Sequence, residues 1–338
     1  MNKLEYLWLD GYDTPNIRSK VKYIELDEVT LDTVPEWGFD GSSTMQADGD
    51  SSDCILKPVK IYGSYRDYVV LCEVMNSDGS PHSTNNRTKL VDLEKKHKDQ
   101  EMWFGIEQEY VIMDPKTNRP YGWPEAGYPM SQGRYYCGVG GDAVQMRHIA
   151  DQHADQCLEF GIPLCGTNAE VMLSQWEYQI GPTSAVEICD DLWVARFLLE
   201  RVAEYFEASI SLSPKPIRGD WNGSGAHINF STKRLREEGG KEYINDIIKV
   251  LMDSHEDHIS EYGIGNEERL TGEHETQHID VFSSGDSDRG ASIRIPPITA
   301  ETYTGYLEDR RPAANMDPYK AVSKIMGTVC RLDNLVGV

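Results

Sequence analysis

Two glutamates, Glu107 and Glu109, stand two residues apart in the apolar stretch 103–110. In a β-strand alternate side chains point to opposite faces, so both carboxylates would project from the same face. Two carboxylates held together on an apolar strand repel each other unless a cation lies between them or one of them is protonated. The spacing therefore indicates either a cation site or an edge strand with two solvated glutamates.

A second pair of glutamates, Glu170 and Glu177, has an odd spacing of seven residues. One straight strand would send these two side chains to opposite faces. A turn near residues 173–174, between two strands, would bring both carboxylates to one side. That hairpin is an assumption, and two surface glutamates are the alternative.

A glycine-rich turn at residues 221–225 leads into His227, Asn229 and Ser231, which share one face of a predicted strand. The glycines let the backbone approach a ligand closely. His227 is then either a ligand or a hydrogen-bonded structural residue, and the pattern alone leaves both open.

Arginines occur in two later stretches. Arg294 is predicted on a strand face opposite Ile293 and Ile295, and Glu308 shares a face with Arg310, which a surface ion pair would also explain. The polar segment 269–276 is predicted to be a mobile surface loop. Residues 138–142 are suggestive of a phosphate loop, but they lack G-x-G-x-x-G and a following Lys-Ser/Thr, so a helix N-terminal turn is expected.

The elements that must position these residues follow from apolar periodicity and turn formers. Strands are predicted at 6–10, 23–26 and 68–74, an irregular segment at 37–44, and a linker at 76–86. Helices are predicted at 87–98, 142–160, 185–208, 243–262 and 319–329, with Asp142 capping the second of them and Gly161 ending it. The larger C-terminal part is therefore expected to be α+β, with functional residues on one face of its sheet.

The bulk composition excludes several classes of protein. A chain of 338 residues is expected to form two domains. A formal net charge of −23 argues against a nucleic-acid partner. No apolar run is long enough to cross a bilayer, and the N-terminus is no signal peptide. Seven cysteines without a C-x-x-C pair favour reduced thiols and a cytoplasmic location.

Taken in order, several blocks of this chain resemble glutamine synthetase in its type II, eukaryotic-like form. The blocks run from about residue 6 to residue 320 and are WGFDGSST, WFGIEQEY, GWP, YYCGVG, GTNAEVM, QWEYQIGP, LWVARF, PKPI, DWNGSGAHINFS, RLTGEHET, ASIRIP and YLEDRRPAANMDPY. So many blocks in the right order are far more specific than any single short motif.

The resemblance implies a fold and a metal centre. It implies a small N-terminal β-grasp domain at 1–79 and a catalytic domain at 80–338 whose strands line an active-site funnel. Two or more divalent cations, Mg²⁺ or Mn²⁺, are implied at its waist. One would be held by Glu109, Glu170 and Glu177, and the other by Glu107, His227 and Glu308. Oxygen-rich ligand sets without thiolates suit such hard ions.

The implied reaction joins ammonia to the γ-carboxylate of L-glutamate through γ-glutamyl phosphate, with ATP as co-substrate. By family position, the glutamate site comprises Trp221, Asn222, Gly223, Arg269, Arg289 and Arg310. The ATP site comprises Glu107, Glu177, Asn229, Phe230, Ser231, Arg289, Arg294, Tyr306 and Glu308. Planar guanidinium groups suit carboxylates and phosphates.

Two further acids and Arg289 are implied to be catalytic. Asp40 resembles the residue that binds ammonium and helps to remove its proton, and Glu275 resembles a flap carboxylate that shields the acyl phosphate from water. In the family Asp40 would come from a neighbouring subunit, and a decamer of two pentameric rings is implied. Glu273, Asp286 and Asp288 depart from the family pattern by adding negative charge.

Other readings remain distinguishable. A γ-glutamyl-amine ligase would share the metal ligands and ATP site, but a larger amine would want a more open or apolar pocket than Asp40 and Glu275 offer. A catalytically dead homologue would be expected to lose metal or arginine positions. A hydrolytic two-metal enzyme would have the carboxylates without the paired arginine strands.

Overall fold

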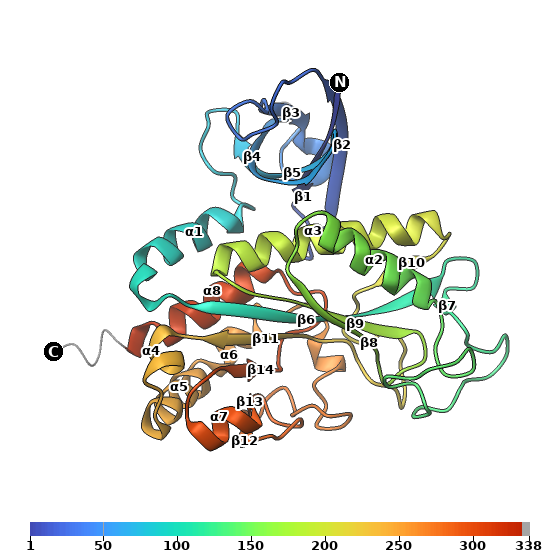
Figure 1. Ribbon diagram of the computed structural model, residues 1–338, viewed down its shortest axis with the longest axis vertical. Coiled ribbons are helices and arrows are strands. Elements are labelled where there is room, and N and C mark those ends of the chain that lie inside the picture. Colours follow the sequence, from blue (N-terminus) through green and yellow to red (C-terminus); the bar gives the residue numbers. More distant parts are fainter. Residues whose placement is uncertain (50, 333–338) are drawn as a thin grey trace.

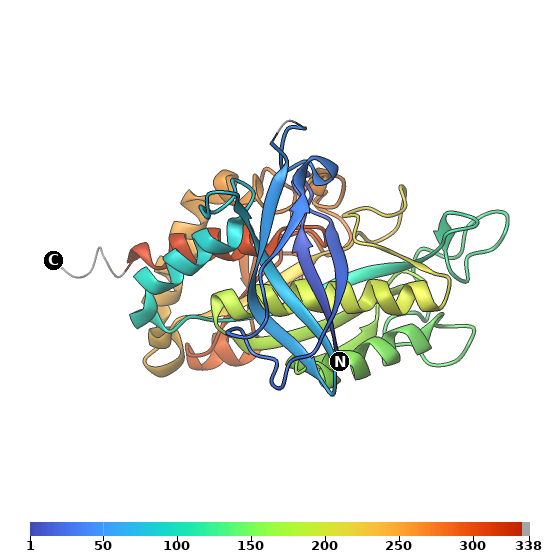
Figure 2. The same cartoon turned by 90° about the horizontal axis from the view of Figure 1, so that it is seen from above.

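The computed structural model describes residues 1–49 and 51–332, which form a mixed α+β fold with two sheets. Figure 1 shows three layers: the N-terminal strands at the top, helices α1, α2 and α3 beneath them, and the strands of a larger sheet below. Seen from above in Figure 2, the N-terminal strands cross over helix α3. The α+β prediction is confirmed.

The first sheet has the strand order β2-β1-β5-β4-β3. Its members are β1 (Asn2–Leu9), β2 (Ile17–Ile24), β3 (Trp37–Asp40), β4 (Asp53–Ser64) and β5 (Asp67–Asn76). β1 and β5 pair in parallel, and the other pairs are antiparallel.

The prediction that residues 37–44 are irregular is wrong. Trp37–Asp40 pairs with β4, and the short 3-10 helix Gly41–Thr44 follows it. Trp37 packs edge-on against Tyr6, and Phe39 packs against Trp8, with ring centroids 5.2 and 5.0 Å apart. These aromatic contacts across the sheet outweigh the weak strand propensity of the glycines.

The second sheet has nine strands, seven of them in the order β12-β13-β14-β11-β6-β9-β8, with β7 and β10 also paired to β6. Its members are β6 (Trp103–Asp114), β7 (Arg119–Pro120), β8 (Leu164–Ala169), β9 (Gln175–Thr183), β10 (Ser209–Ser211), β11 (Ala226–Ser231), β12 (Ser284–Asp286), β13 (Ile293–Ile295) and β14 (Leu307–Asp309). β8 and β9 form an antiparallel hairpin whose turn includes Ser174 at φ +76°, as the glutamate spacing required.

The helices are α1 (Asn86–Lys96), α2 (Arg147–Glu159), α3 (Ala185–Tyr205), α4 (Lys233–Glu237), α5 (Lys241–Asp253), α6 (His255–Ile259), α7 (Pro297–Thr302) and α8 (Pro318–Val329). Three short 3-10 helices span Gly41–Thr44, Lys98–Gln100 and Asn266–Glu268. In the part of the chain that the structure describes, none of the helices has both the length and the apolarity needed to cross a membrane.

Two helix predictions need correction. The helix expected from residue 142 begins at Arg147, and Asp142 is not its cap, because Asp142 instead forms an ion pair of 2.6 Å with Arg134. Met146, in a left-handed conformation, precedes the helix. The helix expected over 243–262 is two helices, α5 and α6, separated at Ser254.

Helix α3 fixes the orientation of the central strand β6. Phe104, Ile106, Gln108 and Tyr110 alternate with more exposed residues along that strand. Gln108 accepts hydrogen bonds from the buried guanidinium of Arg196 on α3, at 3.0 and 2.7 Å. Because Gln108 and the other buried residues of this alternation face the helix, Glu107 and Glu109 project from the opposite face of the sheet.

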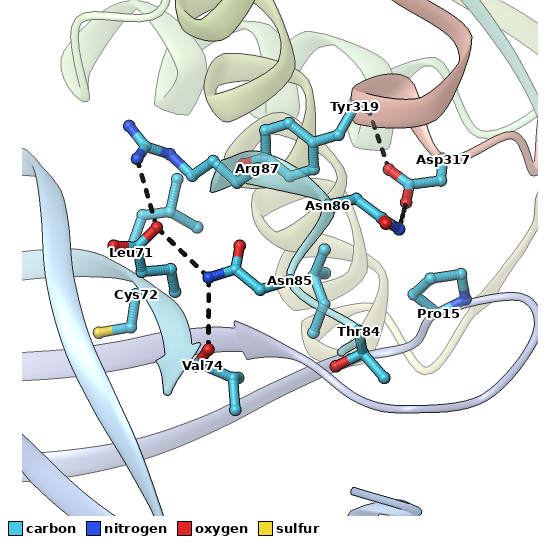
Figure 3. A pocket seen from close by; sticks show the side chains of 12 residues that line it. Pro15, Leu71, Cys72, Val74, Thr84, Asn85, Asn86, Arg87, Asp317 and Tyr319 are labelled. Carbon is cyan, nitrogen blue, oxygen red and sulfur yellow. Dashed lines mark hydrogen bonds and ion pairs between the residues drawn. The ribbon is translucent and has the colours of Figure 1, made fainter. Parts of the chain in front are cut away.

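The two sheets are joined through the start of α1. Asn85 donates to the carbonyl of Val74 on β5, and Asn86 donates to Asp317 at the start of α8, at 3.3 and 2.9 Å. Arg87 forms a bidentate ion pair with Asp190 on α3. Figure 3 shows Val74, Asn85, Asn86, Arg87 and Asp317 around a cavity of about 30 Å³ between the first sheet and the helices.

Candidate active site

Six predicted metal ligands form two groups on one face of the second sheet. Glu107, His227 and Glu308 form the first, called here the histidine cage, and Glu109, Glu170 and Glu177 form the second, called the carboxylate cage. Within each cage, one potential ligand atom from each residue lies within 4.8 Å of the other two.

Strand register brings the histidine cage together. Glu107 of β6 lies opposite His227 of β11, and β14, which carries Glu308, pairs with the far side of β11. The Nδ1 atom of His227 lies 3.4 Å from Glu308 Oε1 and 3.7 Å from Glu107 Oε2. This buried Nδ1 atom has no hydrogen-bond partner among the described residues. It therefore faces the two carboxylates of the cage with its hydrogen-bonding capacity unused.

The carboxylate cage lies on the other side of β6. Glu109 is opposite Glu177 of β9, and Glu170 begins the turn that joins β8 to β9. Hydrogen bonds orient all three: Glu109 accepts from the Gly225 amide at 2.6 Å, Glu170 from Asn168 at 2.9 Å, and Glu177 from Gln179 at 2.7 Å.

Burial and crowding perturb these carboxyl groups strongly. Burial, reinforced by the charges of Glu109, Glu107 and Glu170, raises the pKa of Glu177 to about 9. Burial and the charge of Glu109 raise the pKa of Glu170 to about 8, and burial also raises the pKa of Glu109. Burial lowers the pKa of His227, so its imidazole is neutral and able to act as a ligand.

The donor sets fit divalent cations. Three converging carboxylates that repel one another lose that repulsion when a cation lies between them. The unsatisfied Nδ1 of His227 adds a nitrogen ligand to the histidine cage. Five carboxylates and one imidazole form a ligand set without thiolate.

A pocket of about 350 Å³ adjoins the histidine cage. It is lined by the first residues of β6, by β11 and by residues just before β14, including Glu107, Asn229, Phe230, Ser231 and Tyr306. Five of the predicted ATP-site residues therefore share one cavity. Its lining is mostly apolar, as is usual for pockets that bind small molecules.

The glycine turn adjoins the carboxylate cage at the other end. The Glu109 amide donates to the Gly225 carbonyl at 3.0 Å, and the Gly225 amide donates to the Glu109 carboxylate. A Cβ at Gly225 would lie only 2.4 Å from Arg269 Nη2 and 2.8 Å from His227 Nε2. Glycine is therefore required for the turn to pass between the two cages. Asn222 has a buried side-chain oxygen without a partner among the described residues.

Comparison with known proteins agrees with this geometry. Residues 84–246 match the family model for the glutamine synthetase catalytic domain. The chain is 51% identical over 330 residues to a glutamine synthetase of Emericella nidulans, covering 96% of this chain and 92% of that protein. It is 49% identical over 335 residues to a glutamine synthetase of Saccharomyces cerevisiae, covering 98% and 90%.

The chain belongs to the glutamine synthetase family. Its eukaryotic-like, type II character, expected from the sequence blocks, is confirmed by these fungal relatives. The activity of the family is ATP-dependent synthesis of glutamine from glutamate and ammonia, and it uses a divalent metal.

In this glutamine synthetase the predicted arginines occupy different surroundings. Arg294 and Arg310 each donate to Glu308 at 2.7 Å, so they border the histidine cage. Arg269 is buried; its Nη2 atom lies 3.1 Å from His227 Nε2 and donates to the Arg310 carbonyl at 3.0 Å. Arg289 is exposed, and its charge acts on Tyr136, whose pKa burial raises.

The two acids expected outside the cages lie apart from each other. Glu275 is exposed, and its charge contributes to the raised pKa of Glu170. Asp40 ends β3 in the first sheet and is exposed there. Figure 1 shows β3 on the other side of helix α3 from β6 and β11, two of the strands that carry the cage residues.

Sequence reasoning missed several polar residues around the cages. Gln175 and Gln179 flank Glu177 on the same face of β9, and Gln175 donates to the carbonyl of Gly223 at 2.9 Å. Each glutamine is two residues from Glu177, a spacing that places all three side chains on one face of a strand and that could have identified the glutamines from the sequence. The guanidinium of Arg236 lies 3.9 Å from the Trp103 ring centroid, and both residues line the pocket that adjoins the histidine cage. This contact joins distant segments of the chain, so no local sequence pattern predicts it.

The perturbed carboxyl groups predict a pH-dependent response to metal. Their folded pKa values, about 8 and 9 for Glu170 and Glu177, exceed the ordinary 4.5, so the metal-free chain loses stability as pH rises from about 4.5 through 9. A cation competes with these protons, so its binding strengthens as pH rises. We expect Mg²⁺ to raise Tm by several degrees more at about pH 8.5 than at about pH 6.

Thermal unfolding with and without Mg²⁺ at both pH values measures this difference. Glu177→Gln should remove most of the pH dependence, whereas Glu159→Gln, on the exposed side of α2, should leave it unchanged. Equal Tm increments at both pH values would show that the cages do not exchange protons for metal.

Proposed function

We propose that the two cages hold the ions of a glutamate–ammonia ligase that works through γ-glutamyl phosphate. One observation carries the proposal: both cages begin on one strand, β6, between an apolar pocket on the side of Glu107 and a glycine turn on the side of Glu109. ATP and glutamate would thus reach the ions from opposite ends of a strand-lined funnel.

The histidine cage would hold one ion and the carboxylate cage the other, with Mg²⁺ or Mn²⁺ favoured by ligand sets of oxygen and one imidazole. Bound ions supply charge neutralisation for phosphoryl transfer between anions. Glu107 and Glu308, which serve the ion nearer the pocket, would also lie beside the ATP phosphates, as would Glu177.

Asn229, Phe230, Ser231 and Tyr306 are proposed to hold the nucleotide, supported by their shared pocket. Arg294 reaches Glu308 from β13 and would bind the phosphates. Arg289 is proposed to stabilise charge on the transferring phosphoryl group. The Arg289 side chain is exposed to solvent, so its guanidinium can contact a bound anion.

Trp221, Asn222 and Gly223 are proposed to line the glutamate site, with Arg269, Arg289 and Arg310 binding its carboxylates. The unsatisfied oxygen of Asn222 supports a polar ligand there. Arg269 donates to protein acceptors in the structure, so glutamate binding would exchange one of those contacts for a substrate carboxylate.

In the first step the γ-carboxylate of glutamate attacks the terminal phosphorus of ATP, and ADP leaves. In the second, ammonia attacks the acyl carbon, and phosphate leaves. Glu275 is proposed to cover the intermediate and exclude water, and Asp40 to accept a proton from ammonium. Closure matters because an acyl phosphate hydrolyses readily.

Asp40 is proposed to come from a neighbouring copy in a decamer of two five-membered rings. Its exposure in the first sheet, remote from the cages, supports this. Residues 1–79 are proposed as a β-grasp domain and 80–338 as the catalytic domain, since the first sheet ends at Asn76 and the second begins at Trp103. A cytoplasmic location is proposed, and seven free thiols support it.

An assay of phosphate and glutamine with ATP, Mg²⁺ and glutamate tests the proposed function. We expect equal amounts of both products when ammonium is present and little of either without it. Replacing ammonium by methylamine should lower the rate sharply if Asp40 and Glu275 form an ammonium pocket. Phosphate release at the same rate with and without ammonium would contradict the proposal.

A further inference from the structure

The segment 271–276, called here the flap, contains a tight turn that its own residues do not favour. Thr276 donates its amide to the Glu273 carbonyl at 3.2 Å, which closes the turn. The two central residues, His274 and Glu275, have φ values of +53° and +60°. Glycine or asparagine usually occupies such positions, so contacts outside the turn must help to hold it.

One such contact joins the flap to the loop before the glycine turn. The Nε2 atom of His274 lies 3.3 Å from Asp220 Oδ1, and only 16% of the His274 side chain is exposed. The other oxygen of Asp220 accepts from the Ser131 hydroxyl at 3.1 Å. Asp220 therefore contacts the flap with one oxygen and a third loop with the other.

Lys215 contributes a positive charge to the same loop, and the flap carries negatively charged glutamates. Its ammonium donates to the Trp221 carbonyl, next to Asp220. Burial lowers the pKa of Lys215, and the charges of Asp220, Glu273 and Glu268 oppose that effect. The charge of Glu273, one of the acids that depart from the family pattern, thus acts on this cation of the other loop.

The contact at His274 bears directly on the orientation of Glu275. The two residues are adjacent at the centre of the turn, and the charge of Glu275 adds to the raised pKa of Glu170. Rotation of the turn away from Asp220 would therefore displace Glu275 as well.

We propose that Asp220 is a positioning residue for the flap: its contact with His274 holds the turn that carries Glu275. This inference rests on the proposed function, because it concerns protection of γ-glutamyl phosphate. When the flap opens, water adds to the acyl carbon, the bond from that carbon to the phosphate oxygen breaks, and glutamate and phosphate are released. ATP is then consumed without glutamine.

The test compares phosphate and glutamine released by the full-length protein at saturating ammonium. For Asp220→Ala we expect the phosphate released in excess of glutamine to rise about three-fold, in line with the modest strength of exposed ion pairs. His274→Ala should give the same excess, and the double variant no more than either. Asp220→Asn, which keeps an acceptor oxygen, should restore tight coupling.

Ser131→Ala is the matched control, because it removes the other hydrogen bond of Asp220 and leaves the His274 contact. We expect wild-type coupling from it. Unchanged coupling in His274→Ala, or additive effects in the double variant, would overturn the inference while leaving the proposed function intact. A wild-type protein that makes no glutamine would overturn both.

Discussion

Replacing Glu109 by alanine is expected to lower glutamine synthesis by about a thousand-fold, because loss of a metal ligand removes several kcal/mol of transition-state stabilisation. Glu109 also accepts the amide of Gly225 at 2.6 Å, so its loss affects both the carboxylate cage and the glycine turn. Metal content measured on the same protein should fall by one bound ion per chain.

Two variants separate a metal effect from a general loss of structure. Glu109→Gln keeps the shape and the acceptor oxygen but lacks the charge, and we expect it to be nearly as inactive as alanine. Glu159→Ala, an exposed glutamate on α2, should retain wild-type activity. A Glu109→Gln variant with substantial activity and both ions bound would show that the carboxylate cage is wrongly assigned.

Mixing two inactive variants is expected to restore activity. Asp40→Ala and Glu109→Ala should each be inactive alone, because one lacks the ammonium acid and the other a metal ligand. If each site takes Asp40 from one copy and Glu109 from the next, random assembly of equal amounts gives about one quarter of the sites both residues. We therefore expect about one quarter of wild-type activity from the co-expressed mixture.

The prediction follows from the place of Asp40 in the fold. Helix α3 lies between the first sheet, which carries Asp40, and the sheet that carries the cages (Figure 1). Co-expression of two differently tagged copies of Asp40→Ala is the control and should stay inactive. Absence of recovery in a mixture shown to contain both variants in one oligomer would place Asp40 outside the neighbouring site.

Local patterns predicted the parts of the site that lie on single strands. The alternation around Glu107 and Glu109 correctly indicated one shared face, because β6 pairs on both sides and packs its other face on α3. The hairpin that was assumed between Glu170 and Glu177 is confirmed, although two surface glutamates would have explained the odd spacing equally well. Those spacings could not say that the two glutamates of β6 belong to different cages, since that depends on which strands lie on each side.

Features set by contacts between distant segments were predicted less well. The strand β3 forms because Trp37 and Phe39 meet aromatic residues of β1, which a Gly- and Ser-rich segment does not reveal. The start of α2 moved to Arg147 because Asp142 pairs with Arg134 instead of capping. The burial of Arg269 against His227 is likewise a tertiary effect, invisible in local sequence.

The central claim is that glutamine forms through γ-glutamyl phosphate, and an isotope-transfer measurement tests it most directly. Glutamate carrying heavy oxygen in both positions of its γ-carboxylate is incubated with ATP, Mg²⁺ and ammonium, and the phosphate is analysed by mass spectrometry. We predict that each phosphate carries one heavy oxygen and that glutamine retains the other. Unlabelled phosphate released together with glutamine would contradict the account.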